Sequence, residues 1–288
     1  VVATNCKDCC PFASVLAQVR RAKELTEARG LTYKVAAVCW IQGESNNGGG
    51  GYDAKLLIIV DALNVCIKAI TGQTDDVNVF VESITYNDIE SGHYAVDDEV
   101  MTAVATDSRI HLVMPRYQYN TDVHHSPSAT VSRAYTYAEA IYKVLSARAW
   151  TPLQPLSHTI VGNDIYLNFS VVNPPLQFAM PASNSQTQPL STIIANGGFS
   201  VLNGASSEIL TAVAIDGPTT IKLSCSESPV GGQINYGQTG ETGGVMGGGT
   251  GTRLRGSLCD TNSRKTLTRL SGESYETNNY SILFTRQL

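Results

Sequence analysis

The fold is decided by residues 33–46, which read YKVAAVCWIQGESN. Residues 33–41 form a nearly continuous apolar run, which is typical of a strand that is buried on both faces of a parallel sheet. Directly after this run, Gln42 and Gly43 open a loop, 42–51, that is rich in glycine and asparagine. The stretch therefore predicts a buried strand whose carboxyl end carries amide, carboxylate and backbone N–H groups.

Helical and strand-like patterns alternate around this stretch. In some segments apolar residues recur every three to four positions, and short apolar runs lie between those segments. The predicted helices are 12–29, 53–71, 95–106 and 128–147, and the predicted strands after 33–41 are 77–84 and 110–114. Strand–helix alternation is typical of a parallel sheet with helices on both faces.

Two expectations concern individual side chains in these elements. The helix 128–147 carries its apolar side chains along one side, the pattern of an amphipathic helix. These side chains are Val131, Ala134, Tyr135, Ala138, Ile141, Tyr142 and Leu145. Cys39 and Cys66 lie in apolar runs and are predicted to be buried as small hydrophobic residues.

The sequence changes character at Trp150, beyond which prolines interrupt it. Apolar and polar residues alternate over 164–172, as in a half-buried strand. Further predicted strands are 199–202, 209–215, 220–225 and 281–284. The segment 230–252 is glycine-rich and is predicted to form long surface loops. We therefore expect a partial α/β domain over 1–150 and a small all-β, sandwich-like domain over 151–288.

Composition excludes several classes of partner and site. The 288 residues carry a net charge of −5 and no basic stripe, which argues against a nucleic-acid partner. The apolar stretches are too short to span a bilayer, so no membrane partner is expected. Cys6, Cys9 and Cys10 form one cluster without the second ligand pair that zinc sites usually have, so we predict no metal and no cofactor.

The loop 42–51 has the groups that an acyl-transfer site needs. The backbone N–H of Gly43 and the side-chain amides of Gln42 or Asn46 could stabilise a developing oxyanion. The alternative is a polar turn that caps the next helix, because asparagine, serine and glycine are common turn residues.

A second polar loop, 117–127, follows the third predicted strand. It contains Asp122, His124 and His125. A histidine that a carboxylate orients is the usual general base for a serine hydroxyl. Because both loops follow the carboxyl ends of parallel strands, we expect them on the same rim of the sheet.

Together these motifs resemble the SGNH hydrolases, in particular their sialate O-acetylesterase and acetylxylan-esterase-like group. The W-x-Q-G-E-S-N pattern is similar to the Q-G-E loop of that group, and the resemblance covers roughly residues 10–150. It implies a flavodoxin-like (SGNH) parallel sheet with flanking helices. It also implies oxyanion or substrate-binding roles for Gln42, Gly43, Glu44 and Asn46.

The resemblance also ranks the two histidines. The family has a D-x-H or D-x-x-H block, followed by a helix with a small residue ten positions after the histidine. Ala134 stands at that position counted from His124, which favours His124 as the base and Asp122 as its orienting carboxylate. The alternative register pairs Asp122 with His125 at the commoner spacing.

The sequence departs from the family in one respect. The family's nucleophile is a serine in a G-D-S or G-Q-S turn after the first strand, and none of the 41 residues before Gln42 forms such a turn. Only the last three of the family's five strands can be identified. We therefore expect this chain to be the carboxyl-terminal part of a longer protein, whose missing segment supplies the serine.

The resemblance implies hydrolysis of an O-acetyl ester on a carbohydrate. The expected partners are an acetylated polysaccharide or glycan and the missing N-terminal segment, with homo-oligomerisation left open; the expected location is extracellular or on a virion surface. Tyr117 and Tyr119 flank the base loop and either stack on a sugar ring or pack in the rim. A rival hypothesis is a carbohydrate-binding or structural module of a phage tail fibre or spike without activity.

Overall fold

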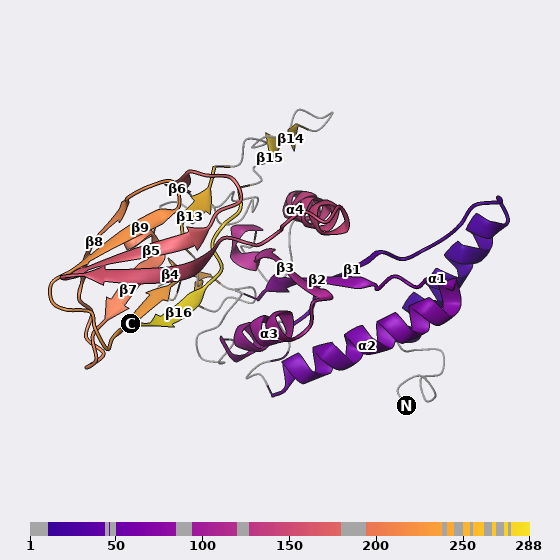
Figure 1. Ribbon diagram of the computed structural model, residues 1–288, viewed down its shortest axis with the longest axis horizontal. Coiled ribbons are helices and arrows are strands. Elements are labelled where there is room, and N and C mark those ends of the chain that lie inside the picture. The colour runs from indigo at the N-terminus through magenta and orange to yellow at the C-terminus, as the bar shows by residue number, and fades with distance from the viewer. Residues whose placement is uncertain are drawn as a thin grey trace.

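The computed structural model describes most of the chain. The described residues are 11–43, 46, 50–84, 94–119, 127–179, 194–237, 241–244, 250–253, 256–261, 267–268, 274–275 and 278–288. Helices surround a small parallel sheet in one part, and antiparallel strands form the other part (Figure 1). The chain is thus a mixed α/β structure with separate parallel and antiparallel sheets.

The parallel sheet has the strand order β1-β2-β3, with helices on both of its faces. The strands are β1 (Ala37–Trp40), β2 (Asn78–Ser83) and β3 (Ile110–Pro115). The helices are α1 (Pro11–Glu27), α2 (Tyr52–Thr71), α3 (Tyr94–Thr106) and α4 (Pro127–Leu145). Helices α2 and α3 pack on one face and α4 on the other (Figure 1), so the predicted helix–strand alternation is confirmed.

The C-terminal end of α2 is explained by the glycine that follows it. Gly72 adopts a left-handed conformation and donates its N–H to the Lys68 carbonyl, 2.8 Å away, which satisfies one of the free carbonyls at the helix end. In the residues that the structure describes, neither α2 nor any other helix is long and apolar enough to cross a lipid bilayer.

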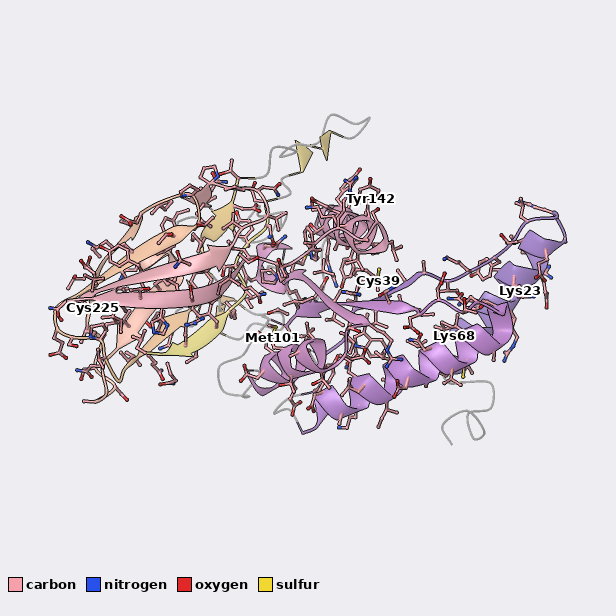
Figure 2. The ribbon with its side chains drawn as sticks, viewed as in Figure 1. Lys23, Cys39, Lys68, Met101, Tyr142 and Cys225 are labelled. Carbon is pink, nitrogen blue, oxygen red and sulfur yellow. The ribbon has the colours of Figure 1, made fainter. Side chains whose placement is uncertain are left out.

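Strand β1 is not buried on both faces, so that prediction is wrong. Its side chains are only partly buried and Cys39 is exposed, while Cys66 is half-buried. Among the described residues β1 pairs with β2 alone, so its outer edge has no neighbour. Figure 2 shows Cys39 on the side of the sheet opposite to Lys68 and Met101, which belong to α2 and α3.

The side of helix α4 that packs on the sheet differs from the predicted apolar side and carries both polar and apolar residues. Arg133 and Tyr137 are buried, whereas Tyr135, Tyr142 and Leu145 are 40%, 56% and 47% exposed. The reason is non-local, because Arg133 pairs with Glu82 of β2 and Tyr137 packs in a cluster with Phe80. Most of the predicted stripe is therefore exposed, whereas Ile141 still packs against the cluster of Phe80 and Tyr137.

The second part contains two antiparallel sheets that share one hydrophobic core. The four-stranded sheet runs β4 (Gln154–Val161), β5 (Asp164–Ser170), β9 (Thr220–Cys225), β8 (Leu210–Ile215). The three-stranded sheet runs β16 (Phe284–Gln287), β10 (Gln233–Tyr236), β7 (Phe199–Leu202). Short pairs join β6 (Leu176–Phe178) to β13 (Leu258–Asp260), β11 (Glu241–Gly244) to β12 (Thr250–Arg253), and β14 (Leu267–Thr268) to β15 (Ser274–Tyr275).

The glycine-rich segment 230–252 is only partly as predicted. Strand β10 lies inside it and forms the middle of the three-stranded sheet, with Ile234 and Tyr236 fully buried. Two apolar residues are too short a pattern to stand out among so many glycines. The last predicted strand, 281–284, is shifted, since the structure has β16 from Phe284 to Gln287.

The β-rich part contacts the parallel sheet at the carboxyl end of β3. A short 3₁₀ helix, Arg116–Tyr119, continues β3 there. Within it, the Tyr117 hydroxyl donates a hydrogen bond to the Ser281 carbonyl, and Gln118 Oε1 accepts the Tyr280 N–H at 3.4 Å. Tyr117 is 4% exposed and packs with Tyr280, so it fills the rim and is not available to stack on a sugar.

This contact yields a stability prediction. Tyr117→Phe keeps the ring but leaves the buried Ser281 carbonyl without its donor, and we expect a loss of about 1–2 kcal/mol in the free energy of unfolding. Urea denaturation measures the loss. Tyr135→Phe, on the exposed face of α4, is the matched control and should change little. Equal effects of the two substitutions would contradict the assigned contact.

Candidate active site

Three strand ends meet at one pocket. Its lining comes from the end of β1, the end of β2, the start of α2, the middle of α3 and the residue after β3. The lining residues are Trp40, Gln42, Tyr52, Val81, Glu82, Ile84, Val100 and Arg116. The pocket thus lies where ligands bind in open parallel sheets, beyond the carboxyl ends of the strands.

Gly43 forms a tightly packed corner of this rim. It is buried, with a backbone φ of +147°, and a Cβ added there would lie 2.2 Å from Ile84 Cδ1. Both the conformation and the contact require glycine. Among the residues that the structure describes, none accepts a hydrogen bond from the Gly43 N–H. A buried donor without a partner is uncommon and is the kind of group that awaits a ligand.

The loop that contains Gly43 is fixed at its first residue. The Tyr52 hydroxyl donates to the Gln42 carbonyl at 2.7 Å, and the Trp40 indole N–H donates to the Tyr52 hydroxyl at 2.9 Å. The Asn46 N–H donates to the Gly43 carbonyl at 2.9 Å. These bonds hold the Gln42–Gly43 peptide in one orientation.

The far end of the loop is fixed by a carboxylate from α3. The Glu99 carboxylate accepts the N–H groups of Gly50, Gly51 and Tyr52 at 3.1, 3.0 and 2.8 Å. These are free N–H groups at the start of α2, where a negative charge also interacts favourably with the helix dipole. The bonds, the one from Gly51 above all, lower the pKa of Glu99.

Asp97 of α3 binds the end of β2. Its carboxylate accepts the Ser83 hydroxyl at 3.0 Å and the Ile84 N–H at 2.9 Å, and the side chain is almost fully buried. Burial raises the pKa of Asp97 to about 7, although both hydrogen bonds act to lower it. Asp97 therefore titrates near neutral pH while it holds the strand that contacts Gly43.

The raised pKa predicts the pH dependence of stability. Between about pH 4 and 7 the folded state binds more protons at Asp97 than the unfolded state, so stability falls as pH rises through this window. The contribution is at most about 4 kcal/mol. Asp97→Asn should flatten this slope in urea denaturation at pH 4.5, 6 and 8.

A second buried acid serves as an internal reference in this experiment. Burial raises the pKa of Asp260 to about 6, so its contribution to the slope has the same sign and persists in the Asp97→Asn variant. An unchanged slope between pH 6 and 8 in that variant would refute the assignment of this window to Asp97.

A buried ion pair borders the pocket, because Glu82 is one of its lining residues. Arg133 of α4 binds Glu82 of β2 through two nitrogens, with Nη2 2.7 Å from Oε2. Burial raises the pKa of Glu82, and Arg133 opposes that rise. Burial and the nearby Arg133 lower the pKa of Arg116 to about 10. Charged groups of both signs thus stand close together on the inner side of the rim.

The structure describes only part of the predicted site. It brings Gln42, Gly43 and Asn46 together at the rim, with Gln42 exposed and Gly43 buried. The other predicted site residues lie outside the described residues; they are Glu44, Asp122, His124 and His125. Their roles stay predictions, as does the choice between the two histidines.

Three charged residues of the rim were missed by the sequence analysis. Glu82 is the one charged residue of strand β2, and Arg116 directly follows β3. An isolated charge within or just after a buried strand is a usable signal, because such groups are rarely buried unless they are paired. Asp97 had a weaker signal, an acidic residue in the first turn of a helix, which usually serves the helix itself.

The fold is similar to that of a solved enzyme. A structure described as that of a novel carbohydrate acetylesterase from Xanthomonas citri superposes with a TM-score of 0.52 at 13% sequence identity, covering 87% of this chain and 50% of that chain. This chain thus spans about half the length of that enzyme. No protein-family model and no curated protein matches the sequence. At this identity the likeness establishes a shared, esterase-like α/β fold.

Proposed function

We propose that this protein hydrolyses O-acetyl esters on a carbohydrate by a serine-type, SGNH-like mechanism. The observation that carries the proposal is the Gly43 N–H, which is buried at the carboxyl end of β1 and has no acceptor among the described residues. A fixed donor of this kind stabilises the oxyanion of acyl transfer. The shared fold with a carbohydrate acetylesterase supports the same reaction class.

The proposed reaction has two halves. A serine hydroxyl attacks the acetyl carbonyl and gives its proton to His124, which Asp122 orients. The Gly43 N–H, with Gln42 and Asn46, binds the oxyanion, and the proposal gives Glu44 a substrate-binding role. The sugar hydroxyl leaves with the proton from His124. Water then attacks the acetyl-serine in the same way and releases acetate.

The serine is proposed to come from a further segment of the same protein that pairs with β1. The outer edge of β1 has no partner among the described residues, and its Cys39 is exposed. Exposed edges of this kind are usually covered. A parallel strand added there would end on the same rim as Gly43 and bring its following turn to the pocket.

Acetate release by the full-length protein tests the reaction. With p-nitrophenyl acetate, His124→Ala should lower kcat/KM by about three orders of magnitude or more, because the base is lost. His125→Ala is the matched control and should retain most of the activity. The opposite result would assign the base to His125. Absence of activity in the intact protein would instead favour a module that only binds carbohydrate.

Covalent labelling locates the serine. A fluorophosphonate probe reacts with activated serines, and peptide mapping after labelling of the full-length protein should place the probe on a serine outside residues 11–288. Labelling should disappear in His124→Ala. A probe attached to Ser45 or another serine of this chain would refute the proposed origin of the nucleophile.

A further inference from the structure

The side chains that lie nearest to Gly43 on its Cα side belong to helix α3 or are bonded to it. The nearest side chains to its Cα face are Ile84 and Val96, at 2.2 and 3.4 Å from an added Cβ. Val96 belongs to α3, and Ile84 follows β2 directly. Ile84 is 4% exposed, so its position depends on what holds its backbone.

The backbone of Ile84 is held by one carboxylate. The Ile84 N–H and the Ser83 hydroxyl both donate to Asp97, at 2.9 and 3.0 Å. These are the last residue of β2 and the one after it, where the sheet no longer supplies a regular partner. Asp97 is the residue after Val96 in α3. The first turn of α3 therefore supplies one side chain that lies against Gly43, Val96, and the carboxylate that binds the backbone of the other, Ile84.

We propose that Asp97 is a positioning residue for the oxyanion donor, because it holds Ile84 against Gly43 and so fixes the direction of the Gly43 N–H. This inference rests on the proposed function, in which that N–H binds the oxyanion. Asp97 does not touch the substrate. Asp97 acts by fixing the Gly43 N–H in its direction before the reaction, and a fixed donor stabilises the transition state more than the bound substrate.

Three substitutions differ in how many of the two Asp97 contacts they keep. Asp97→Asn can keep both contacts, because its amide oxygen accepts the Ile84 N–H and its NH₂ donates to a rotated Ser83 hydroxyl. Asp97→Leu removes both contacts. Asp98→Leu changes the neighbouring exposed carboxylate and is the matched control.

The Gly43 amide gives a readout that does not depend on activity. Gln42–Gly43 is the one Gln-Gly pair in the sequence, so labelling glutamine carbonyls with ¹³C and glycine nitrogens with ¹⁵N yields a single correlation peak for Gly43. We expect this peak to shift or broaden in Asp97→Leu. It should stay in place in Asp97→Asn and in Asp98→Leu.

The kinetic arm uses the full-length protein. Asp97→Leu should lower kcat about tenfold or more, with KM within about twofold, because a transition-state contact is weakened. Asp97→Asn should restore kcat near neutral pH. Absence of activity in the wild-type protein would contradict the proposed function. The Gly43 peak would still test whether Asp97 positions Gly43, because it does not depend on activity.

A milder variant covers the case in which Asp97→Leu does not fold. Ile84→Val keeps the backbone bond to Asp97 and removes only Cδ1, the atom that lies nearest to Gly43. The Gly43 peak should move in this variant too. A folded Asp97→Leu protein or an Ile84→Val protein with an unmoved Gly43 peak would overturn the proposal.

Discussion

Glu82→Gln is expected to destabilise the protein by about 3–5 kcal/mol. The substitution leaves Arg133 buried without its counter-charge, since the Arg133 and Glu82 side chains are only 8% and 3% exposed. The double substitution Glu82→Leu with Arg133→Met should recover most of the loss, because an apolar pair needs no counter-charge. A double-mutant cycle built from Glu82→Leu, Arg133→Met and the double variant measures the coupling by urea denaturation.

An exposed pair provides the control for this cycle. Lys222 and Asp164 lie 2.8 Å apart with about 30% of each side chain exposed, and Asp164→Asn should change stability little because solvent screens the pair. If Glu82→Gln has no larger effect than Asp164→Asn, the ion pair does not hold α4 on the sheet. Helix α4 begins at Pro127, three residues after His124, so under the proposed function Glu82→Gln should also lower the esterase activity of the full-length protein.

Under the proposed function, Gly43→Ala is expected to lower kcat by about two to three orders of magnitude, which is the cost of losing one oxyanion donor. The new methyl group would lie 2.2 Å from Ile84 Cδ1, so either the loop or Ile84 must move, and the Gly43 N–H moves with it. The φ of +147° adds strain for any residue with a Cβ. Steady-state kinetics of the full-length protein with p-nitrophenyl acetate measure the effect.

Gly50→Ala is the control that distinguishes the effect of backbone strain in the loop from the effect of displacing the Gly43 N–H. Gly50 belongs to the same loop and has a φ of +96°, but a Cβ there meets nothing within 4 Å. We expect a stability cost of about 1 kcal/mol and nearly normal kcat. Similar activity losses in both variants would show that the loop as a whole is sensitive, and that Gly43 has no special role as a donor.

Local patterns predicted the elements of the fold well. The helices α1, α2 and α3 lie within a few residues of their predicted limits, because their apolar spacing and glycine stops are local features. The orientation of α4 was not predictable in this way. Arg133 is drawn inward by Glu82, 51 residues away in the sequence, and no local pattern reveals such a pair.

In the candidate site too, local features could be predicted from the sequence and contacts between distant residues could not. The Q-G-E loop was found because strand, glycine and polar residues stand next to each other in the sequence. Asp97 acts on Gly43 only through Ile84, and that chain of contacts exists only after β2 and α3 have packed together. Exposure of Cys39 was missed because an apolar run does not report how many neighbours its strand has.

The contacts of Tyr117 and Gln118 have a consequence for how the chain is made. Their partners, Ser281 and Tyr280, follow them by 164 and 162 residues. A ribosome adds residues in order. The residues at the end of β3 are therefore synthesised long before Tyr280 and Ser281, and until then they lack these two hydrogen-bond partners. Closing so long a loop is slow. A nascent chain therefore forms these two contacts only after Tyr280 and Ser281 have been added, and we expect a chain truncated before Tyr280 to lack both of them.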